Sequence, residues 1–328
     1  MAVPAVAGAQ DAKSEMSSDV PPATTKAAST RGSAVRSNGS SGHFRVPGRV
    51  GRGLAVGMSS RVGEREGILA REALAPGNPM PDARPQIWII VPTYNERDNV
   101  GPISAAILER IPEAHILFVD DGSPDGTGEL ADELARERPA IAVLHRKSKQ
   151  GLGRAYVAGF AEVLARGADI VVQCDADFSH PVRFLPALLE PVLSGRADLV
   201  LGSRYVKGGQ IPRWNIVRRL VSRGGSIFAG VVLLLPYRDL TGGFKAWRSP
   251  ALNVIDLDNL HAGGYGFQIE TTFRARQARV RIVEVPFTFE ERRVGQSKMS
   301  MNIFVEAFLI VVGLRLSTFR RRPVKHLN

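Results

Sequence analysis

The chain has 328 residues, a net charge of +11 and a single cysteine, Cys174. One cysteine excludes intrachain disulfides and a thiolate zinc site, and it is typical of a cytosolic protein. The excess of Lys and Arg indicates phosphate-bearing substrates or an anionic membrane surface as partners. The basic residues are not interleaved with aromatics and no nucleic-acid-binding motif occurs, so nucleic acid is not an expected partner.

Residues 1–84 differ in composition from the rest of the chain. They contain 11 Gly, 7 Pro and a single aromatic residue, Phe44, and they show no sustained helical or alternating pattern. Such a segment cannot bury enough apolar surface to offset the entropy of ordering it. We therefore expect a disordered extension over 1–84, a folded domain over 85–302, and an apolar helix with a basic tail over 303–328.

Apolar runs and helical patterns alternate from residue 87 onward. The apolar runs predict buried strands at 87–91, 116–119, 141–144, 170–173 and 199–201. Helices are predicted between and after these strands, at 97–110, 127–138, 151–166 and 183–193. This alternation is typical of βαβ units, and continuously apolar strands indicate a sheet covered on both faces. The sequence thus predicts an α/β fold with a mostly parallel sheet.

The alternation stops after residue 203. Residues 214–235 and 301–316 predict apolar helices, and residues 281–289 alternate like an edge strand. Neither apolar segment offers the ~20 consecutive apolar residues that a membrane span requires. A core helix and a membrane contact both fit these segments, and the basic residues that follow Glu306 favour docking at a membrane surface.

Polar clusters follow the first four predicted strands, at 92–96, 120–127, 146–153 and 175–177. The carboxyl ends of parallel strands meet at one edge of a sheet, so these clusters should converge. Neither a G-x-G-x-x-G turn nor a P-loop is present, which disfavours dinucleotide and P-loop sites. The two carboxylates of Asp175-Ala176-Asp177 suit a divalent cation that bridges diphosphate oxygens.

Several motifs in this order resemble glycosyltransferase family 2. They are PTYNE at 92–96, VDDGSPDGT at 119–127, DADFSHP at 175–181 and GSRY at 202–205. The second motif and GQSK at 295–298 narrow the resemblance to the dolichol- or polyprenol-phosphate mannose synthases. The resemblance covers about 86–302, which is nearly all of the predicted folded part.

The resemblance implies a GT-A fold and a metal-dependent reaction. Mannose would move from GDP-mannose to a dolichyl or polyprenyl phosphate, with inversion at the anomeric carbon. The residues implied at the guanosine site are Pro92, Tyr94, Glu96, Val119 and Asp121. Those implied at the diphosphate are Asp175, Ala176 and Asp177, with Asp175 and Asp177 binding Mg²⁺ or Mn²⁺. The third ligand is left open between Ser179 and water.

Cationic residues complete the implied site. By resemblance, Arg204, Arg218 and Ser222 would bind the lipid phosphate, while Arg292 and Lys298 would hold the donor diphosphate. An acceptor phosphate oxygen is already anionic near pH 7, so the reaction needs positive charge more than a general base. The implied catalytic residues are Asp177, Arg204 and Asp239, and we expect Asp239 to act by positioning.

Structural rather than catalytic roles are predicted for His180 and Cys174, which flank the Asp175–Asp177 segment. His180 precedes Pro181 and is expected to make a turn-stabilising hydrogen bond, and Cys174 is expected to be a small buried residue.

Alternative functions stay open at this point. They are transfer of glucose from UDP-glucose to the same lipid, another family 2 transfer, or an inactive membrane-docked binding protein. We expect a location at the cytosolic face of a membrane, reached by peripheral contact or through a separate membrane subunit.

Overall fold

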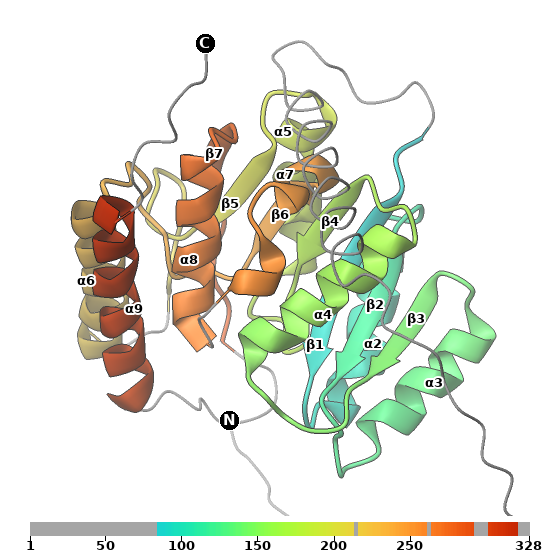
Figure 1. The fold of residues 1–328 in the computed structure, drawn as a ribbon. Helices are drawn as coiled ribbons and strands as arrows, with labels where there is room; N and C mark the ends of the chain where they lie inside the picture. Colours follow the sequence, from blue (N-terminus) through green and yellow to red (C-terminus); the bar gives the residue numbers. More distant parts are fainter. Residues whose placement is uncertain (1–83, 213–215, 261–263, 292–300, 321–328) are drawn as a thin grey trace, which may run out of the picture. The chain divides into compact units, whose positions relative to one another are not determined.

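The computed structural model describes residues 84–212, 216–260, 264–291 and 301–320. The predictions for residues 1–83, Arg292 and Lys298 lie outside these ranges. Within them, the strands form one mixed sheet in the order β3-β2-β1-β4-β6-β5-β7 (Figure 1). The strands are β1 (Ile87–Thr93), β2 (His115–Asp120), β3 (Ile141–His145), β4 (Ile170–Gln173), β5 (Leu199–Ser203), β6 (Lys245–Arg248) and β7 (Ile282–Pro286).

Helices cover both faces of this sheet. The described helices are α2 (Arg97–Arg110), α3 (Thr127–Glu137), α4 (Leu152–Ala165), α5 (Leu185–Leu193), α6 (Ile216–Leu233), α7 (Ser249–Asn253), α8 (Gly264–Gln277) and α9 (Met301–Arg320). The strands and helices predicted before residue 203 are all confirmed, and β7 is the predicted edge strand.

The alternation of side chains along β1 explains the layers. Ile87, Ile89 and Val91 pack into a core with α2, α3 and α5. Trp88 and Ile90 point to the opposite face, where α4, α7 and α8 cover the sheet. All five side chains are buried, and full burial of each such side chain contributes about 1.5–3 kcal/mol. The strand is apolar throughout because both of its faces are covered.

Two central elements were not predicted, β6 and α8. Strand β6 runs antiparallel between β4 and β5, and its four residues include Lys245 and Arg248, so it shows no apolar run. Helix α8 is buried on two sides. Phe267 packs with the sheet core, and Phe273 packs with α6 and α9. A helix covered on two sides lacks the single apolar stripe by which amphipathic helices are found.

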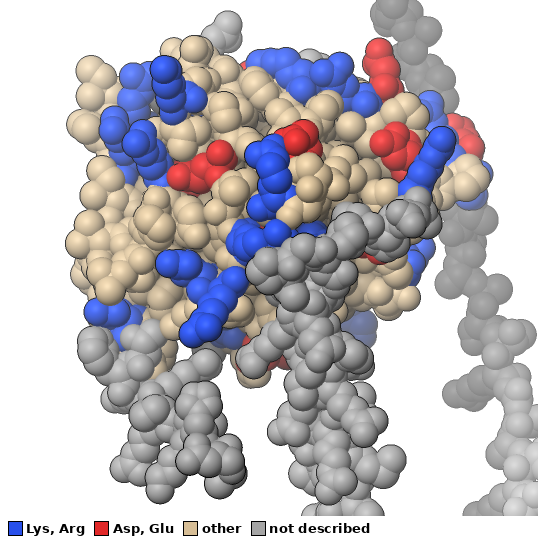
Figure 2. Space-filling model, turned by 90° about the horizontal axis from the view of Figure 1, so that it is seen from above, with Lys and Arg blue, Asp and Glu red and all other residues tan. Residues whose placement is uncertain are grey.

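Helices α6 and α9 lie side by side next to α8 (Figure 1). The rings of Phe228 and Phe308 stack with their centroids 4.9 Å apart. Large apolar side chains nevertheless remain exposed on this pair: Ile216, Leu220, Ile227, Val231, Phe308, Leu309 and Leu316. In Figure 2 a broad tan area on the side of α6 and α9 is bordered by Lys and Arg. None of the described helices is long and apolar enough to cross a membrane.

A buried lysine fastens α8 to β6. Lys245 Nζ donates to the carbonyl oxygen of Gln268 at 2.7 Å, and to the hydroxyls of Thr272 and Thr271 at 3.0 and 3.2 Å. The side chain is fully buried, and this burial lowers the pKa of Lys245 to about 7, against the opposing attraction of Asp239.

This shift predicts a pH-dependent stability. An unfolded lysine has a pKa of about 10.4, so between pH 7 and 10 the unfolded chain binds more protons than the folded one. The free energy of unfolding should therefore rise with pH across this window, by up to about 1.4 kcal/mol per pH unit. Urea unfolding of the wild type and Lys245→Met would measure it. Equal pH profiles for the two proteins would contradict the shift.

Candidate functional site

A cavity of about 190 Å³ opens at the carboxyl edge of the parallel strands. Four consecutive strands of the sheet, β3, β2, β1 and β4, bring their following loops to it, as predicted from the polar clusters. Its lining residues are Pro92, Thr93, Tyr94, Glu96, Asp121, Lys149, Leu152, Ala155, Asp175, Ala176 and Asp177. Most of the residues implied for the nucleotide and the diphosphate thus surround one space. Val119 does not line it, because its side chain is buried in the core beneath α4.

The two adjacent acids at the end of β2, Asp120 and Asp121, make different contacts. The Asp120 carboxylate accepts hydrogen bonds from the backbone N–H groups of Gly122 and Ser123, at 3.1 and 3.0 Å, and from two hydroxyls. The Asp120 carboxylate therefore stabilises the turn through these hydrogen bonds. Gly122 in this turn adopts a φ of 71°, which glycine tolerates best. The next carboxylate, Asp121, lines the cavity instead.

Asp121 is paired with a cation from the loop after β3. Arg146 Nη1 donates to Asp121 Oδ1, and Arg146 Nη2 donates to Gln150 at 3.1 Å. Burial raises the pKa of Asp121 above its usual value, and the Arg146 guanidinium opposes this shift. In the same loop, Lys149 Nζ lies 4.0 Å from the ring centroid of Tyr94. Cations as well as carboxylates therefore lie at this part of the cavity.

Asp175 and Asp177 belong to a tightly held loop after β4. The backbone N–H of Ser179 donates to Asp177 Oδ1 at 3.0 Å, and the Ser179 hydroxyl lies 3.5 Å from Asp175 Oδ2. The Tyr156 hydroxyl donates to Asp175 Oδ1 at 3.4 Å. Burial, followed by the nearby Asp175 carboxylate, raises the pKa of Tyr156, so this hydroxyl remains a donor.

His180 supports the loop, as predicted. Its Nδ1 accepts a hydrogen bond from the backbone N–H of Asp175 at 3.1 Å, so the proton of the neutral imidazole lies on Nε2. The ring is buried and stacks on Phe244 with a centroid separation of 5.0 Å. Cys174 is fully buried, as expected, and burial raises the pKa of its thiol.

The carboxylate pair has the donor chemistry of a divalent cation site. Mg²⁺ and Mn²⁺ prefer hard oxygen ligands, and Mg²⁺ commonly takes one or two carboxylates plus substrate phosphates and water. Both acids line the cavity, and the Asp175 side chain is 31% exposed, which leaves room for a ligand. The described residues contain no group of three or more His, Cys, Asp or Glu that could hold a metal. Further ligands would come from a hydroxyl, the diphosphate or water.

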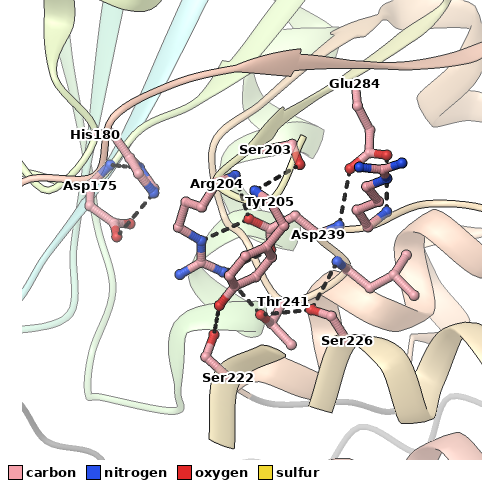
Figure 3. A network of polar contacts seen from close by, with 12 residues as sticks. Asp175, His180, Ser203, Arg204, Tyr205, Ser222, Ser226, Asp239, Thr241 and Glu284 are labelled. Carbon is pink, nitrogen blue, oxygen red and sulfur yellow. Dashed lines mark hydrogen bonds and ion pairs between the residues drawn. The ribbon is translucent and has the colours of Figure 1, made fainter. Parts of the chain in front are cut away.

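A second polar network lies beside this loop, around Arg204 and Asp239 (Figure 3). Arg204 Nε and Nη2 each donate to the Asp239 carboxylate at 2.7 Å, and its backbone N–H donates at 2.9 Å. Arg204 Nη2 also reaches the Thr241 hydroxyl at 3.0 Å. Asp239 is 1% exposed and Arg204 8%. The carboxylate therefore holds the guanidinium in one orientation.

Helix α6 is linked to this network. The Tyr205 hydroxyl donates to the Ser222 hydroxyl at 2.8 Å, and Arg218 lies one turn earlier on the same helix. Glu284 of β7 accepts the backbone N–H groups of Arg238 and Asp239 at 2.9 and 3.0 Å. The segment before β6 is thus tied to β5, β7 and α6 together.

Comparison with known proteins identifies the family. Residues 88–256, more than half of the chain, match the family described as Glycosyl transferase family 2. The chain belongs to this family. It is 47% identical over 226 residues to the undecaprenyl-phosphate mannosyltransferase of Micrococcus luteus, which covers 69% of this chain and 92% of that protein. It is 46% identical over 239 residues to the polyprenol monophosphomannose synthase of Mycolicibacterium smegmatis, covering 72% and 90% respectively.

Solved structures agree on the fold of this family 2 transferase. The glucosyl-3-phosphoglycerate synthase of Mycobacterium tuberculosis, in complex with Mn²⁺, UDP and glucosyl-3-phosphoglycerate, matches with a TM-score of 0.53 at 21% identity. The match covers 78% of this chain and 84% of that one. At this identity the likeness shows the fold alone, and it is the GT-A fold predicted from the motifs.

Sequence reasoning gave no role to several residues of the site. Lys149 lines the cavity, and Arg146 and Tyr156 donate to carboxylates that line it. Tyr205 and Thr241 belong to the Arg204 network. The basic loop at 146–149 was a usable signal, since it follows a strand at the site edge. Tyr156 gave none, because an aromatic residue in an apolar helix indicates core.

The Arg204–Asp239 pair predicts a large stability effect. Asp239→Ala leaves a buried guanidinium without its countercharge and should lower the free energy of unfolding by about 3–5 kcal/mol. Glu190→Ala removes the partner of Arg196 in an exposed ion pair and should cost less than about 1 kcal/mol. Urea unfolding of both variants measures the difference. Equal losses of unfolding free energy would contradict a larger contribution from the buried Arg204–Asp239 pair.

Proposed function

We propose that this family 2 transferase moves mannose from GDP-mannose to a dolichyl or polyprenyl phosphate. The products are the polyprenyl phosphate mannose and GDP, with inversion at the anomeric carbon. The observation that carries the proposal is the placement of a two-carboxylate cavity beside a buried, oriented arginine. The relatives at 47% and 46% identity, which are named for mannosyl transfer to polyprenyl phosphates, support it.

The nucleotide would bind between the ends of β1 and β2. Pro92, Tyr94 and Glu96 come from the end of β1 and Asp121 from the end of β2, and all four line the cavity. Guanine presents adjacent N–H donors on one edge, which suit a carboxylate acceptor, whereas uracil offers a single N–H between two carbonyls. The acidic lining therefore favours a guanosine donor. We keep Val119 as a support for this site through its pairing with Pro92.

The diphosphate would bind near Asp175, Ala176 and Asp177. Asp175 and Asp177 would hold Mg²⁺ or Mn²⁺, and a bound cation would neutralise the charge that develops on the leaving diphosphate. Arg292 and Lys298 are proposed to contact the same diphosphate from the segment that follows β7. Ser179 would fix the Asp177 carboxylate through its backbone N–H.

The acceptor phosphate would bind to Arg204, Arg218 and Ser222. An oxygen of this phosphate forms a bond to the anomeric carbon, while the bond from that carbon to the diphosphate oxygen breaks. The electron pair leaves with GDP, so no proton has to be removed from the nucleophile. Asp239 keeps Arg204 aimed, and the arginine brings two anionic substrates together at low reorganisation cost.

Purified protein with labelled GDP-mannose, undecaprenyl phosphate and Mg²⁺ tests the proposal directly. Lipid-extractable mannose and free GDP are expected in equal amounts. A preference for UDP-glucose would show that GDP-mannose is not the donor. The absence of any lipid-linked sugar would support an inactive binding protein.

Asp177→Asn tests the metal site. The substitution keeps the shape of the side chain and removes its charge, so turnover should fall at least about 100-fold at fixed Mg²⁺. The thermal midpoint should change little. Asp132→Asn, which neutralises an exposed acid on α3, serves as the matched control. Near-normal turnover of Asp177→Asn would refute the metal assignment.

We also propose that the exposed apolar side chains of α6 and α9 contact the cytosolic face of an anionic membrane. The lipid acceptor requires the enzyme to reach a bilayer, and α6 carries both this apolar surface and Ser222. Arg219 and Arg223 are exposed on the same helix and would meet acidic headgroups. The alternative is that a separate membrane subunit covers these apolar side chains.

Vesicle sedimentation distinguishes these cases. Leu220→Asp combined with Val231→Asp should weaken binding to phosphatidylglycerol vesicles at least about 10-fold, since both side chains lose apolar burial. Leu193→Asp, on α5, alters an exposed leucine elsewhere and should bind normally. If wild-type protein does not sediment with vesicles, a membrane subunit is required.

A further inference from the structure

Gln268 on α8 is buried but its side chain lacks hydrogen-bond partners. The residue is 2% exposed, and neither Oε1 nor Nε2 has a partner among the described residues. Buried amides are normally satisfied, and leaving one unpaired costs about 1–3 kcal/mol per group. A donor and an acceptor that both stay open at one position indicate that something else binds there.

The backbone around this amide is held rigidly. The Gln268 carbonyl oxygen accepts from Lys245 Nζ at 2.7 Å and also from the Thr272 hydroxyl at 2.9 Å. This turn of α8 is therefore anchored to β6, while the amide itself is held by no hydrogen bond. The backbone that carries the amide is thus fixed, which is the support that a recognition group on a helix requires.

The amide lies next to Gly243, and Gly242 and Gly243 lie between the Asp175 loop and the Arg204–Asp239 pair. A Cβ atom at Gly243 would come within 3.3 Å of Gln268 Nε2 and 3.4 Å of His180 Cε1, next to the Asp175 loop. A Cβ atom at Gly242 would come within 3.3 Å of Asp239 Oδ1, next to Arg204. Figure 3 shows the Asp175–His180 pair and the Arg204–Asp239 pair on neighbouring loops.

The position indicates the ligand, given the proposed function. The donor diphosphate belongs to the Asp175 side and the acceptor phosphate to the Arg204 side, so the transferred sugar must pass between them. A primary amide offers both a donor and an acceptor, which matches two adjacent sugar hydroxyls. A phosphate would use only the N–H groups and would be repelled by Oε1.

We propose that Gln268 binds hydroxyl groups of the transferred sugar next to Gly243, and so contributes to the choice of sugar. This inference rests on the proposed transferase function. Sites that hydrogen-bond a substrate hydroxyl discriminate strongly against analogues that lack it, because the buried partner is then left unpaired. No other role among the described contacts accounts for both open atoms.

Gln268→Met is the first test, because it keeps the length of the side chain and removes both polar atoms. The value of kcat/KM for GDP-mannose should fall about 10- to 100-fold, while the Kd for GDP, which lacks the transferred sugar, stays unchanged. The thermal midpoint should stay equal or rise, since two unsatisfied polar atoms have left the core. A lower midpoint with normal kinetics would show a structural role, such as a bridge through buried water, and would overturn the inference.

Two further variants sharpen the result. Thr272→Val removes a contact of Lys245 on the same helix and should lower the midpoint without changing the KM for GDP-mannose. Gly243→Ala places a methyl group against the amide and should lower kcat/KM while leaving GDP binding intact. A changed KM in Thr272→Val together with an unchanged kcat/KM in Gly243→Ala would contradict a sugar contact by Gln268.

Deoxy donors identify the hydroxyls. Wild-type enzyme should discriminate against the GDP-deoxymannose that lacks a contacted hydroxyl, and Gln268→Met should lose that discrimination. Equal discrimination by both proteins would overturn the role of Gln268 and leave the proposed transferase function standing. If the wild type transfers no mannose, the proposed donor is wrong, and the same series is repeated with UDP-glucose and its deoxy analogues.

Discussion

The bidentate pair between Arg204 and Asp239 is the interaction on which the site depends. It joins the end of β5 to the segment before β6, and both charges are almost completely withdrawn from water. Removing a charge pair from water is costly, and it is tolerated only where geometry and extra hydrogen bonds are good. Here Thr241 and the backbone of Arg204 supply those bonds. The result is an oriented cation beside an acidic loop.

Carboxylates and cations lie together in both parts of the site. Asp121, Asp175 and Asp177 line the cavity, and Arg146 offsets the first of them. Arg204 lies on the other side with Asp239 as its countercharge. Such an arrangement suits a reaction between two anionic substrates, in which the chemical work is neutralisation and alignment rather than proton transfer.

Much of this could be predicted from local patterns. The apolar runs located five strands, and the polar clusters after four of them identified the site edge, because parallel strands end together. The patterns could not separate Asp120 from Asp121, since only the three-dimensional turn binds the Asp120 carboxylate through its backbone and places Asp121 at the cavity. Strand β6 and Gln268 were missed for a related reason: Lys245 looks like a surface residue until its three acceptors on α8 are known.

The direction of β6 decides which flanking segment can take part in chemistry. Because β6 runs opposite to β4 and β5, its amino end, not its carboxyl end, lies at the site edge. Asp239 through Gly243 are delivered there, whereas Ser249 and α7 are carried to the far edge of the sheet, where Ser249 donates to the carbonyl of Ala168 just before β4. The reversed direction of β6 thus places the segment before this strand, rather than the segment after it, beside the candidate site.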